Sequence, residues 1–185
     1  MFGMNYKLTW NYLLVEREAI FLISHVLSIL VDNNPGVLTR VCALFNRRGF
    51  NIESVSSGHT ENERLTRITL ITKVEDNEGI DQIIKQIRKL EDVHKVEQLD
   101  NENSICKQIL LIKVKAEGNN RQEIINIVNI FRVSIVDVTQ TTLTIEITGD
   151  NSKLCAFENL IRPFGILEIV GSGFIAIQRG AEAIV

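Results

Sequence analysis

The strongest constraint in the sequence is a pattern of hydrophobic periodicity that occurs twice. Between residues 25 and 100, short strand-like segments alternate with two helix-like segments in the order strand, helix, strand, strand, helix, strand. The same order returns between residues 105 and 180, after the polar link "NENS". This order is typical of the ferredoxin-like βαββαβ arrangement, an antiparallel sheet with both helices on one face. The sequence therefore predicts an α+β protein with two consecutive ferredoxin-like domains.

The expected elements follow from where each period begins and ends. Apolar residues recur at helical spacing in some segments, whereas Ile68 and Leu70 alternate with polar neighbours as in a strand with one wet face. The expected helices span residues 36–48, 78–90, 121–132 and 153–165. The expected strands span residues 25–32, 50–57, 64–74, 93–100, 105–116, 133–140, 141–149 and 166–180. Asn151 and Ser152 are the predicted caps of the last helix, and "GSG" at 171–173 is a predicted bulge or turn.

Two domains account for most of the chain, the first over residues 25–100 and the second over 105–185. Residues 1–24 form an N-terminal extension of unknown role. The apolar pieces of this extension are short and are interrupted by three charged residues at 16–18, which argues against a membrane anchor. The extension also lacks the pattern of a secretory signal or an import peptide.

Charge and cysteine content exclude some function classes. A net charge of -3 and an isoelectric point near 5.7 argue against nucleic-acid binding, which needs a concentrated basic face. The three cysteines, Cys42, Cys106 and Cys155, are widely spaced in apolar stretches, as expected of buried thiols in a reducing compartment. Frequent isoleucine and asparagine indicate an AT-rich coding sequence.

No catalytic constellation is visible in the sequence. His25 and His94 are expected at opposite ends of neighbouring antiparallel strands, with the usual order 4-1-3-2, so they do not form a shared metal site. Metal-binding CxxC or HExxH motifs and a phosphate-binding loop are absent from the sequence. The central strands also lack the stacking aromatic residues that an RNA-binding sheet would need.

A strand-to-helix turn, "DNNPGVL" at residues 32–38, is the best candidate site. Pro35 in a first helical turn loses no hydrogen bond, and Gly36 lets a ligand approach the backbone closely. The free N–H groups at the helix start suit a carboxylate, and nearby amide and aliphatic side chains suit the rest of an amino acid. The candidate residues for binding a free aliphatic amino acid are Asn33, Gly36, Val37, Leu38, Asn51 and Ile52. The alternative is an ordinary turn that begins a helix.

These segments resemble a known family. The stretch "LSILVDNNPGVLTRVCALFNRRGFNIESVSSG" is similar to the opening of an ACT domain, in particular that of the small regulatory subunit of acetohydroxyacid synthase, also called acetolactate synthase. Downstream, "IFRVSIVDVTQTTLTIEITGD" and "IRPFGILEIVGSGFIAIQRG" resemble the second domain of that subunit. The likeness covers residues 25–180 approximately and departs from the family pattern in the extension, at His59, where a proline is common, and at Gly171, where an arginine is frequent.

The resemblance implies a non-catalytic subunit of branched-chain amino acid biosynthesis. Such a subunit activates the large catalytic subunit and confers feedback inhibition by valine. The resemblance places thiamine diphosphate, magnesium and FAD on the large subunit and no cofactor on this chain. It also implies a homodimer through ACT domains, with valine at the interface beside Asn33, Gly36, Val37 and Leu38. Asn51 and Ile52 would complete that pocket from the neighbouring chain.

Two other functions and two compartments stay open. A stand-alone ACT sensor serving another enzyme or a transcription regulator would bind an effector without activating the synthase. A metal-responsive regulator would contain bound metal. AT bias without an import peptide favours a plastid-encoded protein of the chloroplast stroma, with a bacterial cytoplasm as the alternative. The surface for the large subunit is sought among exposed residues of the second domain or at Arg40, Arg47 and Arg48, which equally suit a solvated helix face.

Overall fold

The computed structural model describes residues 24–73, 77–100 and 102–184, so the N-terminal extension lies outside the described residues except at its end. Described residues up to Asn103, together with 178–184, form one compact unit, and Ser104–Ile177 form another. No helix within the described ranges is long and apolar enough to cross a membrane.

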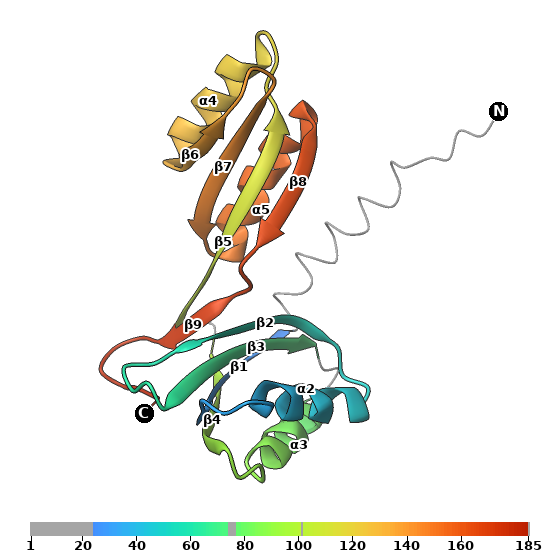
Figure 1. Cartoon of the computed structure of the whole chain (residues 1–185), viewed down its shortest axis with the longest axis vertical. Helices are drawn as coiled ribbons and strands as arrows, with labels where there is room; N and C mark the ends of the chain where they lie inside the picture. The colour runs from blue at the N-terminus through green and yellow to red at the C-terminus, as the bar shows by residue number, and fades with distance from the viewer. Residues whose placement is uncertain (1–23, 74–76, 101, 185) are drawn as a thin grey trace, which may run out of the picture. The chain divides into compact units, whose positions relative to one another are not determined.

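The first unit is a four-stranded antiparallel sheet with two helices (Figure 1). Its elements are β1 (Ser24–Asp32), α2 (Val37–Arg47), β2 (Ile52–His59), β3 (Leu65–Lys73), α3 (Asn77–Ile87) and β4 (Val93–Leu99). The strand order is β2-β3-β1-β4, and both helices lie on the same face of the sheet. This arrangement confirms the predicted ferredoxin-like fold.

The core of the first unit lies between this sheet and its helices. Alternate residues of β1, including Leu27 and Ile29, pack against helical residues such as Phe45, and all three side chains are fully buried. The opposite face of the same sheet is also buried, for example at Leu30 and Ile71. At its central strands β1 and β3, the first sheet is therefore buried on both faces, whereas the edge strand β2 is largely exposed.

The second unit repeats the fold with one additional strand. Its elements are β5 (Ser104–Lys115), α4 (Asn120–Phe131), β6 (Ser134–Val138), β7 (Thr142–Gly149), α5 (Asn151–Ile161), a short 3-10 helix (Arg162–Phe164), β8 (Ile166–Gly171) and β9 (Ile175–Gln178). The main strand order is β6-β7-β5-β8, and β9 also pairs with β5. Phe131 and Phe157 meet edge to face in its core, with ring centroids 5.2 Å apart.

Two local predictions for the second unit meet different outcomes. The expected strand over 166–180 is interrupted after Gly171, and Gly173 adopts a left-handed conformation with φ of 75°. The predicted interruption at "GSG" is thus confirmed, because β8 ends at Gly171 and β9 begins only at Ile175. The predicted caps of α5 are wrong: the cap is Asp150, whose Oδ1 accepts a hydrogen bond from the Lys153 N–H at 2.9 Å.

The C-terminal segment, residues 178–184, groups with the first unit, although the sequence boundary placed it with the second domain. The Arg179 N–H donates to the Asn103 carbonyl at 2.8 Å. Arg67 of β3 donates to the carbonyl oxygen of Ile184, whose side chain is buried. These contacts join residues far apart in sequence. Local periodicity carries no information about such contacts, so it could not predict where the terminal segment packs.

Candidate functional site

The turn between β1 and α2 contains a glycine in a conformation that other residues rarely adopt. Gly36 is the N-cap of α2 and has φ of 83° and ψ of -5°. An added Cβ would lie 3.3 Å from the nearest Arg40 guanidinium nitrogen. Pro35 lies one residue before the N-cap, not in the first helical turn as expected, because the helix begins at Val37. Glycine therefore allows the left-handed backbone that begins the helix, and it places no side chain over the N–H groups of the first turn.

Asn33 fastens this turn to the β2–β3 connection. Its backbone N–H donates to the Arg64 carbonyl at 2.8 Å, and its Nδ2 donates to the Glu63 carbonyl at 3.3 Å. The Asn33 side-chain carbonyl makes no hydrogen bond to the described part of the chain, so it can accept one from a ligand ammonium group.

Donors for a carboxylate gather at the start of α2. The Val37 N–H makes a long hydrogen bond of 3.4 Å to the Asn34 carbonyl, and the next two N–H groups have no acceptor within an α-helix. The dipole of the helix adds partial positive charge at this end. Val37 is buried, whereas Leu38 is 38% exposed and provides an apolar wall.

Arg40 adds a full positive charge beside Gly36. Its Nε and one terminal nitrogen donate to Asp92 Oδ2 at 3.0 Å and 2.6 Å, while the other terminal nitrogen faces Gly36. The sequence pattern placed Arg40 on an outer helix face and did not predict that its guanidinium lies beside Gly36. The available signal was its position one turn after Gly36, since residues four apart meet on a helix.

Asn51 and Ile52 lie at the other end of the sheet. Ile52 is opposite Thr72 at the end of β3, whereas Asp32, which leads into the turn, is opposite Leu65 at its beginning. Nearly the whole of β3 separates them, about 23 Å at roughly 3.3 Å per residue. One chain therefore brings Asn33, Gly36, Val37 and Leu38 together but leaves Asn51 and Ile52 apart from them.

The histidines of the first unit make separate contacts. His94 Nε2 lies 2.7 Å from Asp32 Oδ1, and His25 Nδ1 lies 2.9 Å from the Gln98 side-chain amide. Burial lowers the pKa of His25 below its usual value. The strand register places the two histidines at opposite ends of β1 and β4, as the sequence predicted. Within the described ranges, no group of three metal-binding side chains is assembled.

The β1–α2 turn lies within a part of the chain that matches a known protein family. Residues 27–95 match the family model of the AHAS small subunit-like ACT domain, and residues 107–180 match that of the small subunit of acetolactate synthase. An acetolactate synthase small subunit from Mycobacterium bovis is 45% identical over 161 residues, which cover 87% of this chain and 95% of the relative. The chain belongs to the acetolactate synthase small-subunit family.

The family includes relatives from distant organisms and a solved structure. A "probable acetolactate synthase small subunit" from Archaeoglobus fulgidus is 44% identical over 156 residues, covering 84% of this chain and 97% of the relative. The crystal structure of the small subunit from Thermotoga maritima matches with a TM-score of 0.79 and 42% identity, covering 86% of this chain and 99% of that chain. Both matches extend across the two units.

Family membership confirms the resemblance found in the sequence. The chain is a regulatory small subunit of acetolactate synthase, not the catalytic subunit, and its first unit is an ACT domain. The turn at Gly36 therefore lies in the ACT domain of an acetolactate synthase small subunit, within the matched residues 27–95. The terminal residues 181–185 lie beyond the matched segments.

Proposed function

We propose that this subunit binds valine at the β1–α2 turn and thereby confers feedback inhibition on a large catalytic subunit, which it also activates. The observation that carries the proposal is the open helix start at Gly36, beside the Arg40 guanidinium. In this proposal thiamine diphosphate, magnesium and FAD belong to the large subunit, and the small subunit contributes no cofactor. The pathway is the synthesis of valine, leucine and isoleucine.

The turn offers complementary groups for each part of a free amino acid. The N–H groups of α2 and the guanidinium of Arg40 suit its carboxylate. The Asn33 carbonyl suits its ammonium group. Leu38 offers contact with an aliphatic side chain, whose burial contributes roughly 1.5–3 kcal/mol. Alanine, which is two carbons smaller, should bind more weakly by an amount of similar order.

A second copy supplies the remaining pocket residues in this proposal. Strand β2 is at the edge of the first sheet, so its outer N–H and C=O groups can pair with another strand. If two β2 strands pair antiparallel about a two-fold axis, Asn51 and Ile52 of one copy approach the His59 end of the other. That end is where β3 begins and where the turn at Asn33 is attached. The wide separation of these residues within one chain supports a site shared between two chains.

Regulation requires that valine distinguish two states of the complex. A ligand shifts an equilibrium only through a difference in affinity between the states. We infer that valine, by contacting both ACT domains, stabilises one relative placement of them, and that this placement supports the large subunit less well. A stand-alone sensor would bind valine equally but would not activate the catalytic subunit.

The proposal is tested by calorimetric titration of valine into wild type, Gly36→Asp and Gly36→Asn, with alanine as the size control. Asp and Asn have nearly the same shape, and both tolerate left-handed backbone better than most residues. Only Asp places a carboxylate beside Arg40, so it should weaken valine binding at least tenfold more than Asn does. When the valine concentration is about 100 times the Kd, the free energy of unfolding of the wild type should rise by roughly 2.7 kcal/mol.

The same variants then enter a reconstituted synthase with the large subunit. Valine inhibition should disappear in Gly36→Asp while activation persists, because the substitution lies at the effector turn. Undiminished valine inhibition in Gly36→Asp would rule out this site. Saturable binding without any activation of the large subunit would favour the stand-alone sensor.

The two candidate compartments are supported by different observations. The AT-rich residue usage favours the stroma of a plastid. The relatives above come from bacteria and an archaeon, which favours a cytoplasmic location instead. Locating the coding sequence in a plastid or a bacterial genome decides between the two.

A further inference from the structure

The first unit contains a cleft that the proposed effector site does not use. The cleft lies between α3, strand β4 and the chain that follows β4, and every residue that lines it belongs to the first unit. Its volume is about 450 Å³. Small-molecule sites typically have volumes of roughly 300–1,000 Å³, so a metabolite fits this space. We call this cavity the α3–β4 cleft.

The α3–β4 cleft and the effector turn lie at opposite ends of β4. Val93, at the beginning of β4, is opposite Val31 near the turn, whereas Leu99, which lines the cleft, is opposite Val26. The length of β4 from Val93 to Leu99 is about 20 Å at roughly 3.3 Å per residue. β4 and β2 are also at opposite edges of the sheet, so a dimer joined through β2 would leave one complete cleft on each copy. The two sites are therefore separate.

The cleft has an apolar floor and a polar rim. On the helix side, its residues have the spacing i, i+3, i+4 and i+7, which places them on one face of a helix: residues 81, 84, 85 and 88. Ile84 is 8% exposed and Leu99 of β4 is 6% exposed, so these two side chains form the floor. Asp81, Lys85 and Arg88 are exposed and form the helical rim. A few polar groups around an apolar surface are typical of a ligand site.

Two cations lie along one end of this rim. Lys85 and Arg88 are one helical turn apart, so their side chains are neighbours. One terminal nitrogen of Arg88 donates to the Val96 carbonyl at 3.4 Å, which places the guanidinium beside the middle of β4. Neither cation forms an ion pair with a carboxylate of the described residues. Both charges are therefore available to the carboxylate of a ligand.

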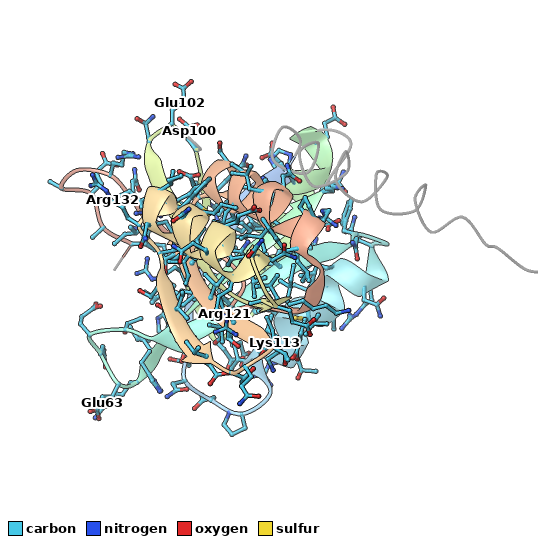
Figure 2. All side chains as sticks on the ribbon, turned by 90° about the horizontal axis from the view of Figure 1, so that it is seen from above. Glu63, Asp100, Glu102, Lys113, Arg121 and Arg132 are labelled. Atoms are coloured by element: carbon cyan, nitrogen blue, oxygen red, sulfur yellow. The ribbon has the colours of Figure 1, made fainter. Side chains whose placement is uncertain are left out.

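Two carboxylates lie toward the other end. Asp81 is two helical turns before Arg88, a separation of about 10 Å at roughly 1.5 Å per residue. Asp100, labelled in Figure 2, follows the end of β4 and lines the same cleft. Its oxygens accept hydrogen bonds from the Glu102 N–H at 3.2 Å and from Asn103 Nδ2 at 2.9 Å, which orient the carboxylate. This end of the cleft suits a cation.

A third carboxylate accompanies the two cations. Glu97 lines the cleft and directly follows Val96, the residue that Arg88 contacts. Its Oε1 lies 3.2 Å from Lys95 Nζ. One end of the cleft therefore contains both an anion-binding pair and a carboxylate, the combination that the carboxylate and ammonium groups of a free amino acid require.

We propose that the α3–β4 cleft binds a free dibasic amino acid, with L-lysine as the probe. Lys85 and Arg88 bind its carboxylate, and Glu97 binds its α-ammonium group. The aliphatic chain of the ligand lies over the apolar floor. Asp81 and Asp100 bind the second ammonium group at the far end. A ligand with charge at one end only would leave the carboxylates at the other end without a partner.

This inference goes beyond valine binding and does not rest on it. The cleft shares no residue with the effector turn, and a dibasic amino acid has no place beside the exposed Leu38 of that turn. The subunit would then respond to two amino acids of different chemistry through two sites of one ACT domain.

Equilibrium dialysis of the full chain against labelled L-lysine tests the proposal, because it measures bound ligand whatever the enthalpy of binding. L-Norleucine has the same carbon chain without the second ammonium group, and L-lysinamide lacks the carboxylate. Each should compete with lysine at least tenfold less well than unlabelled lysine does. Absence of bound lysine at millimolar concentration, or equal competition by norleucine, would overturn the proposal.

Two substitutions at the rim and one matched control locate the bound lysine. Lys85→Gln and Asp81→Asn each remove one charge from an exposed side chain, and each should raise the Kd for lysine at least tenfold. Lys89→Gln removes the same charge from an exposed lysine that does not line the cleft, and it should bind as the wild type does. A Kd that is unchanged in both rim variants, or raised equally in Lys89→Gln, would overturn the proposal.

Gly36→Asp separates this site from the effector turn. It should bind lysine with the wild-type Kd although its valine binding is weakened. Loss of lysine binding in Gly36→Asp would place lysine at the effector turn and overturn the proposal. Valine titration of Lys85→Gln should match that of the wild type, so failure of one site is distinguishable from failure of the other.

Discussion

The two units share a strand order but differ at the turn after their first strand. In the first unit, Gly36 leaves the start of α2 uncovered. In the second unit, the turn before α4 is closed by Arg121, which is labelled in Figure 2. The Arg121 guanidinium donates to the carbonyls of Ala116 at 3.2 Å, Thr139 at 2.6 Å and Gln140 at 2.7 Å. The same topology thus produces a helix start in both units, but side chains decide whether a ligand can reach it.

The two sheets also differ in the solvent exposure of the face opposite their helices. The first sheet is buried on both faces at its central strands, whereas the second leaves Leu111 and Val170 partly exposed. The unit with an accessible turn therefore has a covered sheet, and the unit with a closed turn has an uncovered one.

Removing one aromatic side chain from each core should show whether the units are stable separately. Phe45 and Phe157 are fully buried, each in a different core, and truncation of a buried phenylalanine costs about 3–5 kcal/mol. Phe45→Ala should increase amide hydrogen exchange in the first unit and leave residues 104–177 protected. Phe157→Ala should do the reverse. Equal loss of protection in both units would show that they unfold as one.

The two arginines near the turns should differ in their contribution to stability. Arg121→Ala removes charged donors from three carbonyls and should lower the free energy of unfolding by roughly 1.5–3 kcal/mol. Arg40→Ala breaks an exposed pair with Asp92 and should cost less than about 1 kcal/mol. Urea denaturation measures both values. A larger loss in Arg40→Ala than in Arg121→Ala would contradict the assignment of Arg40 to binding.

Helix capping gives a smaller difference. α5 is capped by the Asp150 side chain, whereas α2 has Gly36 at its N-cap and no side-chain cap. Asp150→Ala should cost about 1 kcal/mol, or a decrease in Tm of roughly 4–8 °C if the second unit unfolds alone. Asp150→Asn retains an acceptor and should remain near wild type in the same thermal scan. A normal Tm for Asp150→Ala would mean that Asp150 does not stabilise the helix.

The smallest expected effect concerns the thiols. Burial raises the pKa of Cys106 from 9.0 to about 11, and burial also raises the pKa of Cys42. At pH 8 about one Cys106 in a thousand is ionised, and its alkylation rate should rise tenfold per pH unit up to about pH 11. Because the folded state retains the proton, this group stabilises the fold below pH 9 and ceases to do so as the pH rises to 11. Mass spectrometry after timed alkylation measures the rate, and a plateau near pH 9 would exclude the shift.

Most of the fold was predictable because its signals are local. The alternation around Leu110 and the helical spacing around Phe45 specify which side of each element is buried. The cap of α5 was missed by one residue because Asp150, Asn151 and Ser152 are all good capping residues, and only the exact helix start selects among them.

The candidate site was predictable only in part. Asn33, Gly36, Val37 and Leu38 are close in sequence, and a strand followed at once by Pro-Gly indicates a helix start that a ligand can approach. The position of the Arg40 guanidinium depends on Asp92, which is contributed by the segment before β4. A contact between residues so far apart in sequence leaves no trace in local spacing.

The amino-acid sequence by itself determined the two βαββαβ units, their buried faces and the glycine at the helix start, because periodicity and turn chemistry act between near neighbours. The tertiary structure alone decided that Arg40 faces Gly36, that Ile52 lies far from the turn within one chain, and that residues 178–184 return to the first unit. These features arise when elements distant in sequence pack together, and side-chain period specifies which face packs but not what it packs against.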